Sequence, residues 1–105
     1  MDIRQEWSEQ NNTWHISLSG EIDIYNAPEL KDNMLKLIEE NKGDILIDCA
    51  DLKYIDSTGL GVLISALRRV KEYNGKITIK NLKPYIYRIF AITGLDKVFT
   101  IEVQE

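Results

Sequence analysis

The segment with the clearest capacity for chemistry is residues 56–61, which read Asp-Ser-Thr-Gly-Leu-Gly. It follows the strand-like run 44–49 and precedes the apolar run 62–70, which has the character of a helix. Two hydroxyls therefore stand where a helix is expected to begin, and the free backbone N–H groups of a helix start carry partial positive charge. A phosphate or an oxyanion at Ser57 would be stabilised by that charge. Ser57 is therefore a candidate for a modification switch.

The same residues have a simpler interpretation, because Asp56, Ser57 or Thr58 could cap the helix. Capping and switching are compatible with each other. Two glycines in the first turn, however, weaken a helix by about 1 kcal/mol each. That loss is easier to understand if another molecule must approach the backbone closely. The glycines therefore favour a contact site in addition to a cap.

Three other kinds of chemistry find little support in the sequence. His15 is the only histidine and is expected on the polar side of a strand, which disfavours a Ser–His–Asp hydrolase built on Ser57. Residues 59–61 are too few for a Walker loop and lack its lysine. The acids show no spacing that converges on a metal ion. We therefore expect neither an enzyme nor a bound cofactor or metal.

Asp48 requires separate consideration, because it lies in an expected central strand like the phosphoacceptor of receiver domains. Receiver domains also need an acidic pair just after the first strand. Asp2 and Glu6 come too early and belong to an expected hairpin. Asp48 is therefore expected to end its strand and to tie down the following loop.

Composition limits the class of protein. The 105 residues leave room for one domain over residues 1–105, and a hydrophobic content of 44% suffices for a core without disulfides or metal. The net charge of -4 disfavours nucleic acid as a partner. Cys49 is expected to be a buried, reduced thiol. The N-terminus lacks the features of a signal peptide and no apolar stretch could span a bilayer, so we expect a cytoplasmic protein without a membrane partner.

Hydrophobic periodicity predicts elements in the order β-β-α-β-α-β-α-β. Strands are expected near residues 3–7, 13–20, 44–50, 76–80 and 99–103, and helices near 27–41, 57–73 and 84–92. The first two strands are expected to form an antiparallel hairpin. Asn26 and Glu29 are expected to form a capping box at the first helix, and residues 51–55 a connection.

The order of the elements predicts how the layers are arranged. Strand–helix–strand crossovers are right-handed, so all helices lie on one face if neighbouring strands follow chain order. Alternation within 13–20 and 76–80 indicates that the other face of the sheet stays partly exposed. The apolar run 45–47 predicts a central strand. The fold class is therefore α/β, a right-handed βα superhelix with a mixed, mostly parallel sheet, an N-terminal antiparallel hairpin and helices mainly on one face.

Three segments resemble the signature segments of STAS-domain anti-sigma factor antagonists. They are residues 20–28 (GEIDIYNAP), 54–62 (YIDSTGLGV) and 92–95 (ITGL). The resemblance covers essentially the whole chain, and the Asp-Ser-Thr-Gly-Leu-Gly segment is its most specific part. Within the family the chain is most similar to the antagonist of the bacterial general-stress sigma factor. The resemblance implies a STAS-type fold.

The resemblance also implies a partner-switching function. The unmodified antagonist binds an anti-sigma factor that is also an ATP-dependent serine kinase, and the sigma factor is released. Phosphorylation by this kinase ejects the antagonist, and a serine phosphatase resets it. Carried onto this chain, the phosphoacceptor is Ser57, with Thr58 as second choice. The implied partner-binding residues are Glu21, Asp23, Tyr25, Asp56, Ser57, Thr58, Gly59, Leu60 and Gly61, of which the acids form a rim suited to basic groups.

An alternative function is a STAS protein- or ligand-binding module without a phosphorylation cycle, as in transporters and lipid-transport systems. The intact Asp-Ser-Thr-Gly segment disfavours this alternative. One departure from the family pattern is that many relatives continue into a further helix, whereas this chain stops at residues 103–105. We therefore expect an exposed edge or face that is available for self-association or an extra contact.

Overall fold

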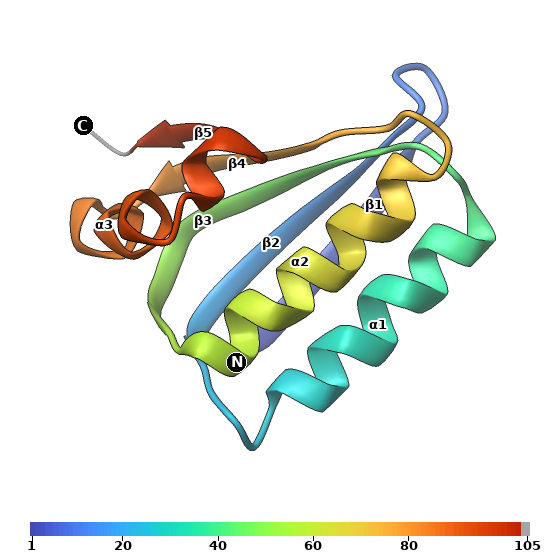
Figure 1. Ribbon diagram of the computed structural model, residues 1–105. Helices are drawn as coiled ribbons and strands as arrows, with labels where there is room; N and C mark the ends of the chain where they lie inside the picture. Colours follow the sequence, from blue (N-terminus) through green and yellow to red (C-terminus); the bar gives the residue numbers. More distant parts are fainter. Residues whose placement is uncertain (104–105) are drawn as a thin grey trace.

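The computed structural model in Figure 1 describes residues 1–103, and residues 104–105 lie outside the described part. Within this range one sheet contains β1 (Asp2–Ser8), β2 (Thr13–Ile22), β3 (Asp44–Ile55), β4 (Ile77–Leu82) and β5 (Thr100–Val103). The helices of the same range are α1 (Ala27–Glu40), α2 (Ser57–Lys71) and α3 (Pro84–Ile92), and a short 3-10 helix, η1 (Leu95–Lys97), precedes β5. The predicted order of elements is confirmed.

The strands lie in the sheet in chain order, β1-β2-β3-β4-β5, so β3 is central as predicted. β1 pairs with β2 in antiparallel fashion, and all other neighbours are parallel. α1 and α2 pack side by side over one face of the sheet, and α3 stands apart from them at one end of the sheet (Figure 1). The α/β class with an N-terminal hairpin is therefore confirmed.

The core lies between the sheet and the helices. It is formed by hydrophobic side chains that alternate along the strands and follow one stripe of each helix, among them Ile16, Leu18, Ile47, Leu30 and Leu63. Cys49 belongs to it and is a free thiol, and burial raises its pKa to about 12. The other face of the sheet carries exposed polar side chains, which confirms the predicted half-exposed sheet.

β3 is longer than predicted, because residues 51–55 continue the strand and are not a connection. They pair with the end of β2 across two register shifts, the first between Ser17 and Ser19 and the second between Gly20 and Glu21. Such bulges place an extra residue in one strand and break the alternation of buried positions. The alternation of hydrophobic and polar residues therefore does not predict that residues 51–55 continue the strand. It carries β3 as far as the start of α2.

Asn26 does not form the predicted capping box with Glu29, since its side chain makes no hydrogen bond to the start of α1. Instead, Asn26 Oδ1 accepts a hydrogen bond from the N–H of Asp23 at 2.9 Å, and Asn26 Nδ2 donates to the carbonyl of Glu21 at 2.9 Å. Asp23 Oδ1 accepts from the N–H groups of Tyr25 and Asn26. These bonds fix the loop between β2 and α1, which borders the candidate site.

Candidate functional site

The corner between β3 and α2 is held by the carboxylate of Asp56. Asp56 Oδ1 accepts hydrogen bonds from the N–H of Thr58 at 3.0 Å, from the N–H of Gly59 at 3.1 Å and from the hydroxyl of Thr58. This is the arrangement of a helix N-cap. The bond from the Thr58 hydroxyl, followed by the bond from the Gly59 N–H, holds the pKa of the Asp56 carboxyl below its usual value.

Ser57 is the first residue of α2 and its side chain is exposed. Asp56 already provides the cap, and within residues 1–103 the Ser57 hydroxyl takes part in no side-chain hydrogen bond. The hydroxyl of Thr58, by contrast, is bound to Asp56. Of the two hydroxyls in the motif, Ser57 is therefore the one that is free to react or to contact another molecule.

The loop after β2 lies beside this corner. The N–H of Asp56 donates to the carbonyl of Ile22 at 3.1 Å, which joins the end of β2 to the start of α2. The neighbouring strand pairing places Glu21 opposite Tyr54, just before the corner. The structure thus brings the segment that holds Glu21, Asp23 and Tyr25 to the same end of the molecule as Asp56.

A hollow of about 350 Å³ lies between the first turns of α1 and α2. Its lining is mostly apolar and consists of Ile24, Ala27, Pro28, Lys31, Thr58 and Val62. Ile24 is 62% exposed and Tyr25 is 90% exposed, so two adjacent large hydrophobic side chains are in contact with solvent beside this hollow. Ile24 is not among the residues predicted from the sequence, because an isoleucine is usually buried and its exposure appears only in the structure.

The two glycines of the corner have different roles. Gly59 is buried, and a Cβ there would lie 2.6 Å from the Ile55 side chain and 2.7 Å from the Ile22 side chain. The interpretation that both glycines open the surface is therefore wrong for Gly59, which lets α2 pack on the strands. Gly61 is exposed, and a Cβ there would meet nothing within 4 Å. Leu60 is only 6% exposed, so its side chain packs into the core, contrary to the expected partner contact.

His15 is far from Ser57. It is exposed and lies opposite Glu6 on the helix-free face of the sheet, whereas Ser57 begins a helix on the other face. His15 also precedes Ile22, which is next to the corner, by seven strand residues, or about 23 Å. The structure therefore contains no Ser57–His15 pair for nucleophilic catalysis.

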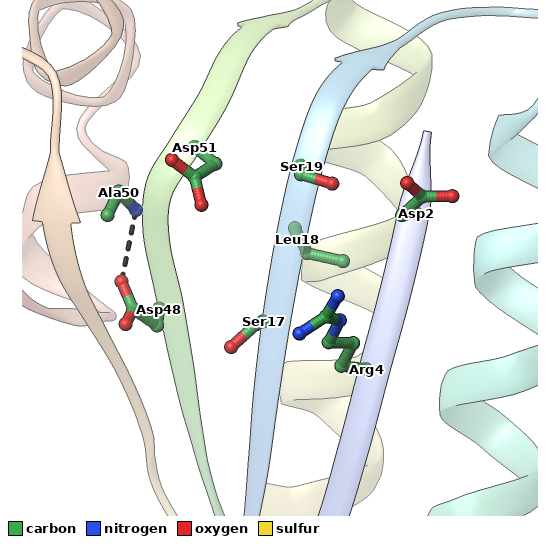
Figure 2. Close-up of a pocket in the computed structure, with 8 residues that line it drawn as sticks. All are labelled: Asp2, Arg4, Ser17, Leu18, Ser19, Asp48, Ala50 and Asp51. Atoms are coloured by element: carbon green, nitrogen blue, oxygen red, sulfur yellow. Dashed lines mark hydrogen bonds between the residues drawn. The ribbon is translucent and has the colours of Figure 1, made fainter.

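A second hollow, of about 210 Å³, lies on the helix-free face of the sheet (Figure 2). It is lined by Asp2, Arg4, Ser17, Leu18, Ser19, Asp48, Ala50 and Asp51. Asp48 Oδ1 accepts hydrogen bonds from the N–H of Ala50 and from Asn81 Nδ2, each at 3.0 Å. Burial raises the pKa of Asp48, but these bonds and the charge of Lys80 outweigh burial and lower it. The predicted strand end at Asp48 is wrong, because β3 continues to Ile55 and no loop follows Asp48. Its carboxylate instead fixes the backbone of the same strand at Ala50.

No helix in the part of the chain that the structure describes is long and apolar enough to cross a membrane. Among residues 1–103, no group of three or more His, Cys, Asp or Glu side chains is arranged to hold a metal ion.

Comparison with known proteins gives consistent matches. The family model described as the STAS domain matches residues 5–105. The anti-sigma-B factor antagonist of Bacillus subtilis (strain 168) is 35% identical over 104 residues, which cover 99% of this chain and 94% of the relative.

Two solved structures of one antagonist are similar in fold. The anti-sigma factor antagonist SpoIIAA in its unphosphorylated form has a TM-score of 0.82 at 20% identity, covering 98% of this chain and 90% of that one. The Bacillus cell fate determinant SpoIIAA in its phosphorylated form has a TM-score of 0.75 at 20% identity, covering 98% and 93%. At this identity the likeness shows the fold.

Proposed function

This chain belongs to the STAS family, and we propose that it is an anti-sigma factor antagonist controlled by phosphorylation of Ser57. In this proposal the unmodified protein binds an ATP-binding anti-sigma factor serine kinase and so releases the sigma factor. The kinase phosphorylates Ser57, the complex dissociates, and a serine phosphatase restores the unmodified form. The protein acts in the bacterial cytoplasm as a binding partner and not as an enzyme. Its similarity to the Bacillus subtilis anti-sigma-B factor antagonist supports the proposal.

The observation that carries the proposal is that Asp56, and not Ser57, caps α2. The Ser57 hydroxyl is exposed and makes no hydrogen bond to the cap, so the serine has no capping role at this position. A kinase active site can reach such a hydroxyl without unfolding the helix. The phosphorylated SpoIIAA structure, which is similar in fold, supports modification of an antagonist with this architecture.

Electrostatics explains how phosphorylation would change binding more than folding. A phosphoserine carries about -1.5 to -2 charges at neutral pH. The N–H groups at the start of α2 can receive the phosphate, so the fold is retained. Asp56 and the nearby loop acid Asp23 repel it, and a contact surface adapted to a neutral hydroxyl has no room for it. The partner therefore loses affinity while the antagonist stays folded.

The surface around Ser57 also indicates the chemistry of the kinase contact. Ile24 and Tyr25 present exposed apolar area. Glu21 and Asp23 belong to the same segment of the chain, and Asp56 lies at the adjoining start of α2. Interfaces commonly combine an apolar centre with a polar rim. The matching surface on the kinase should therefore have an apolar centre and basic residues around it.

The test is to incubate the protein with a cognate ATP-binding anti-sigma factor kinase and ATP and to map the modified residue by mass spectrometry. We expect one phosphate at Ser57, no phosphate in Ser57→Ala, and retained phosphorylation in Thr58→Val. Phosphate found solely at another residue would contradict the assignment. Kinase binding with no phosphate transfer would instead favour a STAS binding module without a phosphorylation cycle.

A further inference from the structure

A groove of about 470 Å³ lies between the C-terminal half of α2 and η1, away from the serine corner. It is lined by Ile64, Leu67, Arg68, Lys71, Leu95 and Val98. Arg68 follows Ser57 by eleven residues, a separation of about 16 Å along the helix. The lining shares no residue with the hollow beside Thr58. The groove is therefore a separate surface.

The chemistry of the groove is distinctive within this chain. Its lining is almost entirely apolar and contains no acid, and Arg68 and Lys71 contribute mainly their aliphatic stems to it. Both of these residues are exposed, so their charges are available at the edge of the groove. Val98 is 50% exposed, so part of the apolar lining is in contact with solvent. The whole chain carries a net charge of -4. An apolar groove edged by two cations is suited to a partner that is apolar at its centre and acidic at its flanks.

We propose that this groove binds an acidic amphipathic helix of a partner protein. The apolar side chains of such a helix recur every three or four residues and form a ridge that a groove beside a helix accepts. Aspartate or glutamate residues that flank the ridge pair with Arg68 and Lys71. This is the helix-in-groove mode of recognition, in which apolar anchors give affinity and flanking charges give orientation.

Charge and shape distinguish this occupant from two others. A second copy of the chain, docked through the same groove about a two-fold axis, would place its Arg68 and Lys71 against the same cations of the first copy. Such like-charge contacts are unfavourable. A lipid surface requires apolar side chains that protrude into the bilayer boundary, whereas this surface is hollowed. An acidic helix satisfies both the charge and the shape.

The test uses a displayed library of random peptides about four helical turns, or about 15 residues, in length. Selection on the wild-type protein should enrich peptides with an apolar stripe flanked by Asp or Glu. Their affinity, measured by fluorescence anisotropy, should fall at least about tenfold in Arg68→Glu. Arg69→Glu is the matched control, because Arg69 is the next residue of α2 and does not line the groove, although it shares another hollow with Arg68. It should change the affinity clearly less than Arg68→Glu does, because the Arg69 side chain is absent from the groove lining.

Val98→Lys separates groove binding from general attraction to positive charge. It removes apolar lining and adds a cation, so the proposal expects weaker binding, whereas attraction to charge alone would strengthen it. Arg68→Glu and Val98→Lys should keep the wild-type circular dichroism spectrum, because the side chains that they replace are exposed. Ser57→Asp should bind the selected peptides as the wild type does. That result keeps this test independent of the proposed phosphorylation.

Several outcomes would overturn the proposal. Among them are failure to enrich any peptide that prefers the wild type to Val98→Lys, enrichment of peptides without acids, and equal effects of Arg68→Glu and Arg69→Glu. A dimer that is detected by light scattering and abolished by Val98→Lys would assign the groove to a second copy. Flotation with phosphatidylserine vesicles that is lost in the same variant would assign it to a lipid surface.

Discussion

Two aspartates on opposite faces of the sheet make similar local hydrogen bonds in very different surroundings. Asp56 accepts from the N–H of Thr58 at the start of α2, and Asp48 accepts from the N–H of Ala50 within β3. In each case the acceptor lies two residues before the donor, and in each case the pKa of the carboxyl is lowered. Local motif chemistry alone therefore does not separate a structural carboxylate from one that belongs to the candidate site.

The neighbours make the difference. Asp48 also binds the side chain of Asn81, and the hollow beside it is polar (Figure 2). Asp56 organises a corner in which the Ser57 hydroxyl stays free and exposed apolar side chains such as Ile24 lie nearby. An unused reactive group beside exposed apolar area is what distinguishes the corner. The comparison predicts that equal changes at the two places have unequal effects on partner binding.

The largest expected effect comes from a negative charge at each place. Ser57→Asp should weaken binding to the kinase about a hundredfold, or about 3 kcal/mol, because it adds charge beside Asp56 at the contact surface. Ser17→Asp makes the same change at an exposed serine of the helix-free face and should alter the affinity less than about twofold. Isothermal titration calorimetry with the purified kinase measures both affinities.

Circular dichroism and urea unfolding provide the controls for these two variants. Both proteins should keep the wild-type spectrum, since both serines are exposed. Unfolding of Ser57→Asp, or an equal loss of affinity in Ser17→Asp, would remove the distinction between the corner and the helix-free face.

The second comparison lies within the corner, between two glycines that are two residues apart. Gly59→Ala should lower the free energy of unfolding by about 1–3 kcal/mol, because its methyl group would overlap the side chains of Ile55 and Ile22. Gly61→Ala should raise the free energy of unfolding by about 0.5–1 kcal/mol, because alanine favours the helix and meets no neighbour there. Urea denaturation measures both changes, and equal destabilisation would contradict the different roles of the two positions.

This pair of glycines also shows how far the sequence could be interpreted. The order of strands and helices followed from periodicity, because the alternating and helical patterns are each set by one buried face. Gly59 was misinterpreted because its neighbours, Ile22 and Ile55, come from β2 and β3, and only the folded chain brings them against α2. Sequence spacing contains no information about such a contact.

The other differences have similar causes. The end of β3 was missed because bulges interrupt its alternation. The side chain of Asn26 bonds to the loop and not to α1, since Asp23 and Glu21 offer competing partners. Ile24 was not selected because an isoleucine is usually buried, and its exposure is visible only in the structure. The motif predicts Ser57 as the centre of the candidate site, whereas the surroundings of Ser57 appear only in the tertiary structure.

A substitution at Ile24 should have a smaller effect on kinase affinity than Ser57→Asp and tests the same corner. Ile24→Ser should weaken kinase binding about tenfold through the loss of exposed apolar contact area, with little change in the free energy of unfolding. Ile92→Ser is a matched control, because Ile92 is even more exposed, at 85%, but lies at the end of α3. It should leave kinase affinity unchanged. A comparable loss in both variants would show that apolar exposure in general, and not the corner, determines the affinity.

The smallest expected effect is the pH dependence of the two aspartates. The pKa of each carboxyl is lowered from 3.8 in the folded protein, so each stabilises the fold above pH 3.8. That stabilisation is lost as the pH falls through the lowered pKa values, because a protonated carboxyl accepts hydrogen bonds poorly. The urea midpoint should therefore decrease below pH 3.8, and by a smaller amount in Asp56→Asn and in Asp48→Asn than in the wild type.

Amide resonances can assign the two titrations separately. The Thr58 N–H should report protonation of Asp56, and the Ala50 N–H should report protonation of Asp48, because each donates to that carboxylate. Both midpoints in a nuclear magnetic resonance titration should fall below 3.8. Phosphorylation of Ser57 should move only the Thr58 midpoint, and upward, because a neighbouring negative charge favours the protonated carboxyl. An equal movement at Ala50 would mean that the two faces of the sheet are coupled, and the contrast between a structural and a functional carboxylate would then fail.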